Sequence, residues 1–273
     1  ACGIEMPLVR SWWLGRKRGK EAWVRPLIVP DPDHPSGKRV DFQIGRGTDG
    51  APTGRDWTVS GRRGARCVAC AAWIDIRAIR EQALVGRMGS VLMAIAAQGK
   101  NGRYYLPPSP EHAAAAEVAR PDRIVVGTVS DNPRWFSPPA YGLTKFADLF
   151  TNRQLLALTT FSDLVCEARE RVAREARVKG MPAGDRLEQG GVDAEAYADA
   201  VATYLGLALS RASDYSSSIC SWHASRDTVR NVFARQAIPM VWDFAETNVL
   251  SGASGSLLSQ IEWIAGAVRE VPA

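Results

Sequence analysis

The chain has 273 residues, of which 46% are hydrophobic and 23% charged, an ordinary globular composition that allows one large domain or two smaller ones. No stretch holds the roughly 18 to 20 uninterrupted apolar residues of a membrane helix, and the first residues have neither the basic start nor the apolar run of a signal peptide. We therefore expect a cytoplasmic protein without a membrane partner.

The net charge of +5 is unevenly divided along the chain. Residues 1–140 hold 21 Lys and Arg against 13 Asp and Glu, a balance of +8, whereas residues 141–273 hold 13 against 16, a balance of −3. Lys and Arg make the phosphate contacts that dominate nucleic-acid affinity. The basic half is therefore a candidate surface for a polyanion, although charge alone is equally consistent with a solvated basic face.

Short β-type runs separated by Gly and Pro turns fill the first 66 residues, at 23–29, 40–44 and 57–59. The pattern then allows a helix over about 75–98, a short strand at 103–106 and a second helix over about 110–119. Residues 121–140 contain four prolines and are predicted to link a first region, 1–120, to a second, 141–273.

The second region is predicted to be helical. Thr151 and Gln154 form a capping box, with Phe150 and Leu155 placed as a hydrophobic staple, for a helix that runs to about residue 179. Further helices are expected to about residues 212, 247 and 270, and the second of these should be kinked by a proline. Their predicted caps are Asp193, Asp227, and Ser254 or Ser256. The predicted fold class is α+β, with a small β-rich, zinc-ribbon-like N-terminal part followed by a mainly helical domain.

The five cysteines are an odd number in a chain without secretory features, which argues against a disulfide framework. Cys67 and Cys70 have the spacing of a zinc knuckle, because two thiolates separated by two residues can take adjacent corners of a tetrahedron. A redox pair has the same spacing but requires a βαβ context that the pattern lacks. Cys166 and Cys220 are expected to be buried small side chains.

Cys2 followed by Gly3 matches the end of a second knuckle of the form Cys-x-x-Cys-Gly. On this interpretation the chain begins inside a Cys₄ zinc ribbon, with Cys2, Cys67 and Cys70 as the remaining ligands and the fourth upstream of residue 1. The alternative is that Cys2 is incidental and the other two are buried thiols. His34 or His223 could also complete a site, although a lone histidine is more often a surface or hydrogen-bonded residue.

Several segments resemble a family of bacterial adenine-specific DNA methylases that contain a zinc ribbon. Besides Cys2-Gly3, the matching segments are 7–14 (PLVRSWWL), 66–70 (RCVAC), 141–154 (YGLTKFADLFTNRQ), 214–218 (DYSSS) and 230–246 (RNVFARQAIPMVWDFAE). The sequence departs from the family at Asn248-Val249, where Asn-Pro is typical.

The resemblance implies that this region lies between an upstream segment that binds S-adenosylmethionine and a downstream Asp-Pro-Pro-Tyr motif. Neither motif is in the sequence, and its nearest match, Ser137-Pro138-Pro139-Ala140-Tyr141, has Ala140 where the stacking aromatic would stand. We expect no catalytic residue and no cofactor-binding residue in this chain, with S-adenosylmethionine bound only by the parent protein.

Basic and aromatic residues give a candidate nucleic-acid interface. The pair Trp12-Trp13 precedes a basic run, an arrangement that suits base stacking together with phosphate contact. It suits equally well a zinc ribbon whose core holds the tryptophans and whose solvent-exposed edge holds the basic run. In the helical region, Asn231 and Arg235 would share a helix face, where salt bridges or caps are the commoner role. The candidates are Trp12, Trp13, Arg16, Lys17, Arg18, Arg62, Arg63, Lys145, Arg153, Asn231 and Arg235.

Three functions remain open at this point. The first is a non-catalytic segment that binds or orients DNA for an S-adenosylmethionine-dependent amino-methyltransferase, with DNA and the remaining methyltransferase core as partners, in a restriction or phage-defence setting. The second is a non-enzymatic zinc-ribbon adaptor that binds protein or RNA. The third is a cysteine-based redox protein.

Overall fold

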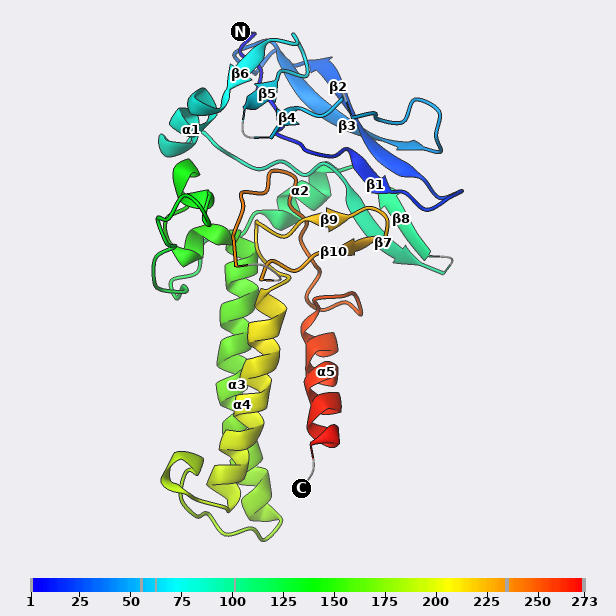
Figure 1. The fold of residues 1–273 in the computed structure, drawn as a ribbon. Coiled ribbons are helices and arrows are strands. Elements are labelled where there is room, and N and C mark those ends of the chain that lie inside the picture. Colours follow the sequence, from blue (N-terminus) through cyan, green and yellow to red (C-terminus); the bar gives the residue numbers. More distant parts are fainter. Residues whose placement is uncertain (1, 55, 62, 101, 234–235, 272–273) are drawn as a thin grey trace.

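The protein combines small antiparallel sheets with helices, which confirms the predicted α+β class. A computed structural model describes residues 2–54, 56–61, 63–100, 102–233 and 236–271. The β-rich part lies at one end of an elongated molecule, and three helices extend from it as a stalk, with the two termini at opposite ends (Figure 1). None of the helices in these ranges is both long and apolar enough to cross a bilayer.

The first sheet is built on a long antiparallel ribbon. Its order is β1 (Trp13–Gly15), β2 (Ala22–Pro30) and β3 (Lys38–Arg46). The predicted runs at 23–29 and 40–44 are therefore strands, in a register that pairs Val24 with Ile44. Alternate residues of both strands face one side, where they bury Trp12 and Val9 in a small core.

A second sheet follows, and it carries the first helix. It comprises β4 (Val59–Ser60), β5 (Gly64–Arg66) and β6 (Trp73–Asp75), and Asp75 caps α1 (Ile76–Leu84). The predicted helix over 75–98 is thus too long. It ends where Gly86 takes a left-handed φ of 75°, and residues Ile95–Gly99 instead form β7, which pairs with β8 (Gly102–Leu106).

The proline-containing segment 121–140 is not only a linker between two regions, because its end packs against other parts of the protein. After α2 (Pro110–Ala116), the chain forms two 3₁₀ helices, η1 (Pro138–Tyr141) and η2 (Phe146–Leu149). Pro138 and Tyr141 are buried, and the Tyr141 ring meets Trp242 edge to face at 4.9 Å. The end of this segment therefore belongs to a core.

The capping box at Thr151 and Gln154 is confirmed. The Gln154 amide donates to the Thr151 hydroxyl at 3.3 Å, and the Thr151 amide donates to the Gln154 side chain at 2.9 Å. The stalk consists of α3 (Asn152–Val178), α4 (Ala194–Ser213) and α5 (Leu257–Glu270). Asp193 precedes α4 and Ser256 caps α5, although only the Ser256 side chain accepts a capping hydrogen bond.

The predicted helix from Asp227 to about residue 247 is wrong. Trp222–His223 and Thr228–Val229 form a hairpin, β9 and β10, and the described part of 230–247 is irregular. This segment returns from the stalk to the N-terminal half, where the Ser11 amide donates to the Asp243 carboxylate at 3.1 Å. Burial raises the pKa of Asp243, against the effect of the backbone amides that donate to it. Contacts of this segment thus join the first and second regions.

A carboxylate network fixes the connection between α3 and α4. The Arg186 side chain donates to Asp199 at 2.6 Å and the Arg169 side chain at 2.8 Å, while the Leu187 amide, in η3 (Leu187–Gln189), donates at 3.1 Å. These contacts, with Arg186 the largest, hold the pKa of Asp199 well below its usual range.

A pKa that is lowered by folding contributes stability that is fully present above the unfolded value of about 3.9, and this contribution is lost as the pH falls from that value through the lower pKa of the folded state. We expect the melting temperature to fall progressively from about pH 5 to about pH 2, and Asp199→Asn to make that fall shallower. Circular dichroism melting across this range tests the prediction. The exposed Asp122→Asn is the matched control, and an equal effect of both substitutions would contradict it.

Candidate metal centre

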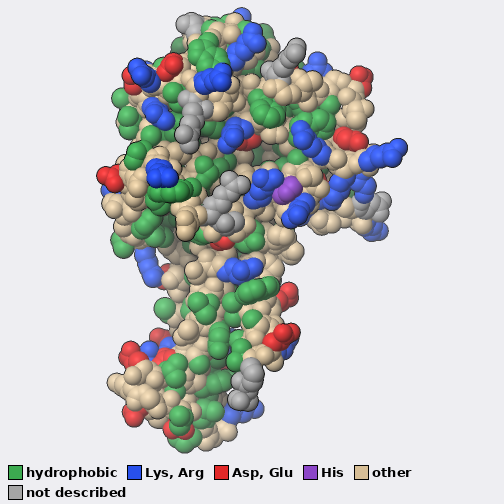
Figure 2. All heavy atoms as spheres, in the orientation of Figure 1, with side chains coloured by type: hydrophobic (Ala, Val, Ile, Leu, Met, Phe, Trp, Pro, Cys, Tyr) green, Lys and Arg blue, Asp and Glu red, His purple; other side chains and the backbone are tan. Residues whose placement is uncertain are grey.

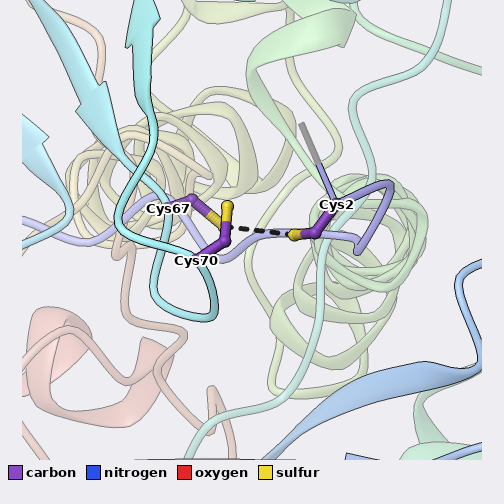
Figure 3. Close-up of side chains that lie close together, drawn as sticks. All are labelled: Cys2, Cys67 and Cys70. Carbon is purple, nitrogen blue, oxygen red and sulfur yellow. Dashed lines mark hydrogen bonds between the residues drawn. The ribbon is translucent and has the colours of Figure 1, made fainter.

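Three cysteine side chains from two distant parts of the sequence converge on one point. Cys2 lies in the N-terminal segment, and Cys67 and Cys70 lie in the turn between β5 and β6 (Figure 3). The Sγ atoms of all three lie within 4.8 Å of one another, and those of Cys2 and Cys67 are 3.7 Å apart. Sulfurs on a tetrahedral zinc with bonds of about 2.3 Å are separated by about 3.8 Å. The predicted ligands are therefore placed together in a cluster that could hold a metal ion.

The backbone on both sides of the cluster has the form of a knuckle. The Cys67 amide donates to the Ala72 carbonyl at 2.9 Å, and the Ala71 amide donates to the Cys67 carbonyl at 2.9 Å. Ala71 follows Cys70 with a φ of 58°, and Gly3 follows Cys2 with a φ of 75°. The residue after each of these cysteines is thus left-handed, which turns nearby amides towards the sulfurs.

The two knuckle thiols differ in acidity. An amide hydrogen bond from Ala72, followed by the neighbouring thiols of Cys2 and Cys67, lowers the pKa of Cys70 to about 7. Burial raises the pKa of Cys67, which is the inner of the two. Because the thiolate is the metal ligand, Cys70 is the group most ready to bind at neutral pH.

The other candidate ligands lie elsewhere. Cys220 is buried as expected, but Cys166 is exposed on α3, contrary to the prediction. His34 is hydrogen-bonded to Ser36 at 2.7 Å, and His223 belongs to the β9–β10 hairpin. Within the described ranges, neither histidine is part of the cysteine cluster.

An open groove of about 690 Å³ lies beside the cluster. Cys67 forms part of its wall, together with Arg25, Arg66 and the half-exposed Trp57. The sequence did not indicate Trp57 as a candidate contact residue, because the pattern of 57–59 predicts only a strand. The cluster and the groove belong to the basic half of the chain.

The two adjacent tryptophans have different roles in the structure. Trp12 is only 2% exposed, and its indole N–H donates to the Asp56 carbonyl at 2.7 Å, so its ring offers no face for base stacking. Trp13 is half-buried, and the Arg16 guanidinium lies 4.9 Å from its ring centre. The core interpretation therefore holds for Trp12. Lys17 and Arg18 are exposed with Arg16 in the β1–β2 turn.

The remaining predicted nucleic-acid contacts that the structure describes come from several separate segments of the chain. Arg153 pairs with Glu246, and the Asn231 side chain donates to Asp214 at 3.0 Å, so both make contacts within the protein. Asn231 lies in irregular chain, not on the expected helix face. Lys145 is exposed at the N-cap of η2, and Arg63 is exposed in the β4–β5 turn. The predictions for Arg62 and Arg235 fall outside the described residues.

Comparison with protein-family models, with curated proteins and with solved structures gave no significant match for this chain.

The left-handed Ala71 generates a prediction about the knuckle. A side chain at positive φ costs about 1 to 2 kcal/mol, so Ala71→Gly should raise the free energy of unfolding of the metal-free protein by about 1 kcal/mol. Urea denaturation in the presence of a chelator measures this change. Ala72→Gly is the matched control, because its φ is not in the left-handed region and glycine there only adds entropy to the unfolded chain. Equal loss of stability in both variants would refute the prediction.

Proposed function

We propose that this chain is a zinc-stabilised, non-catalytic segment that binds or orients DNA for an S-adenosylmethionine-dependent amino-methyltransferase. The observation that carries the proposal is the meeting of three thiols, from residues 65 apart in sequence, within the basic half of the chain. The resemblance of segments 7–14, 66–70 and 230–246 to zinc-ribbon DNA methylases supplies the reaction class.

The choice of zinc rests on ligand chemistry. Three thiolates at this spacing suit a soft or borderline ion with tetrahedral preference, and they do not suit the hard cations Ca²⁺ or Mg²⁺, which take oxygen ligands. Zinc at this position would be structural. It would join the N-terminal segment to the β5–β6 turn and so fix the edge of the second sheet against the first.

DNA is favoured as the partner by the charge distribution. The half that holds the thiol cluster has a balance of +8, and the stalk half a balance of −3. The Ser137–Tyr141 segment supports a non-catalytic role, since Tyr141 is buried and cannot stack on a flipped base. A zinc-ribbon adaptor for protein or RNA would share the metal centre but would not require binding to duplex DNA.

The metal is tested directly by titrating the reduced protein with Co²⁺ and Zn²⁺. We expect one equivalent to bind, with thiolate-to-cobalt charge-transfer absorption, and Cys67→Ser to weaken affinity by more than about 100-fold, since loss of even an outer-shell partner costs 10- to 100-fold. Cys166→Ser is the control, because Cys166 is exposed on α3. A reversible Cys67–Cys70 disulfide without bound metal would favour the redox alternative.

DNA binding is tested by fluorescence anisotropy with a mixed-sequence duplex over a salt series. The logarithm of the association constant should fall with the logarithm of salt concentration at a slope steeper than about −3, which corresponds to at least three or four phosphate contacts. Methyl transfer from S-adenosylmethionine to duplex adenine is expected from the parent protein and not from this chain alone. Binding to RNA or protein with no affinity for the duplex would favour the adaptor.

A further inference from the structure

Three β-hairpins that are far apart in sequence meet at one place on the basic half. In the β1–β2 turn, the Arg16 amide donates to the Ala224 carbonyl of the β9–β10 turn at 2.9 Å. On β9, the Trp222 indole donates to the Leu14 carbonyl at 2.6 Å, and the β7–β8 hairpin reaches the same carbonyl through the Tyr105 hydroxyl at 2.9 Å. These contacts hold the ends of the three hairpins in a fixed relation.

The acidic residue that joins the three hairpins is occupied by contacts within the protein. Residues 13–21, 95–106 and 222–230 carry eight Lys and Arg and two acids, Glu21 and Asp227. Asp227 is only 9% exposed; its carboxylate lies 2.8 Å from the Tyr105 hydroxyl, which donates to it, and 2.6 Å from the Lys17 ammonium. It therefore neutralises Lys17.

Several of the remaining cations are open to a ligand. Arg18, Lys100, Arg226 and Arg230 are exposed, and none of them forms an ion pair with a residue that the structure describes. Two of these cations lie close enough to His223 to affect its pKa. Burial makes the largest contribution to lowering the pKa of His223, and the positive charges of Arg230 and Arg226 lower it further. Figure 2 shows Lys and Arg side chains gathered over this part of the molecule.

We propose that Arg16, Arg18, Lys100, Arg226 and Arg230 form a binding surface, here called the hairpin surface, for the phosphate backbone of duplex DNA. This inference rests on the proposed function and assigns its DNA contact to a specific site. Exposed cations without acidic partners are the groups that contact phosphates and release counterions. The backbones that carry these cations are held by the contacts between the three hairpins, so little of the backbone has to become ordered on binding.

A duplex suits the hairpin surface better than a single strand does. Single-strand sites stack bases on free aromatic rings. Here the Trp13 ring has the Arg16 guanidinium 4.9 Å from its centre, and its indole donates to the Pro52 carbonyl at 3.2 Å. Trp222 meets Tyr105 edge to face at 6.3 Å. The rings of Trp13, Trp222 and Tyr105 are thus engaged in packing, and Tyr104 on β8, which is 45% exposed, is a single ring beside several exposed cations.

The experiment compares charge-removal variants in fluorescence anisotropy with a mixed-sequence duplex. Arg226→Ala/Arg230→Ala removes two charges from the third hairpin, and Arg18→Ala/Lys100→Ala removes one from each of the other two. Each double variant should reduce the magnitude of the salt slope by about two and weaken Kd by about tenfold or more at 0.1 M salt, equally for different sequences. Arg174→Ala/Lys179→Ala, two exposed cations at the far end of the stalk, is the matched control and should change neither.

The outcomes separate the inference from the function on which it rests. If the wild-type protein binds the duplex and the hairpin variants bind it as the control variant does, the hairpin surface is overturned and the proposed function stands. A wild-type protein that binds only RNA or no nucleic acid would overturn both. NMR of the wild-type protein gives a readout that needs no variant: duplex titration should shift the ring signals of His223 and leave those of His34, in the β2–β3 turn, unchanged. Shifts at His34 alone would also overturn the proposal.

Discussion

The buried carboxylate of Asp227 joins parts of the chain that are more than 100 residues apart. It accepts from Tyr105 on β8 and pairs with Lys17 in the β1–β2 turn, and its own backbone takes a left-handed φ of 54°. A buried group left without its partner costs about 1 to 3 kcal/mol, so each of these polar groups depends on the others. This arrangement ties β8 and the β1–β2 turn to the β9–β10 turn.

Residues 240–243, which follow the helices α3 and α4 in sequence, complete the core of the N-terminal half. Met240 and Trp242 pack against the cluster of Val59, Ala65 and Ile79, although they follow the stalk in sequence. Asp243 adds a half-buried acceptor for the Ser11 amide. The core of the N-terminal half therefore includes side chains that lie beyond the proline-containing segment at 121–140.

Features set by neighbouring residues could be predicted from the sequence, and features set by distant contacts could not. The capping box at Thr151 and the Cys67-x-x-Cys70 knuckle depend on residues within one turn of each other, and both are present. Residues 227–247 have a helix-like pattern, but this segment makes its hydrogen bonds and apolar contacts with distant parts of the chain, among them Ser11, Arg153 and Asp214. The sequence gives no sign of Arg226 as a candidate DNA contact for the same reason, because only the folded chain brings it beside the β1–β2 turn.

The separation of the thiols along the chain has a thermodynamic consequence. Cys2 and Cys67 lie 65 residues apart, so an ion bound by both would close a loop of that length. For a covalent cross-link, the loss of unfolded-chain entropy for such a loop corresponds to roughly 4 kcal/mol. A bound ion acts in the same sense for as long as it stays coordinated. Metal supply would then decide how many conformations the first quarter of the chain can visit before it folds.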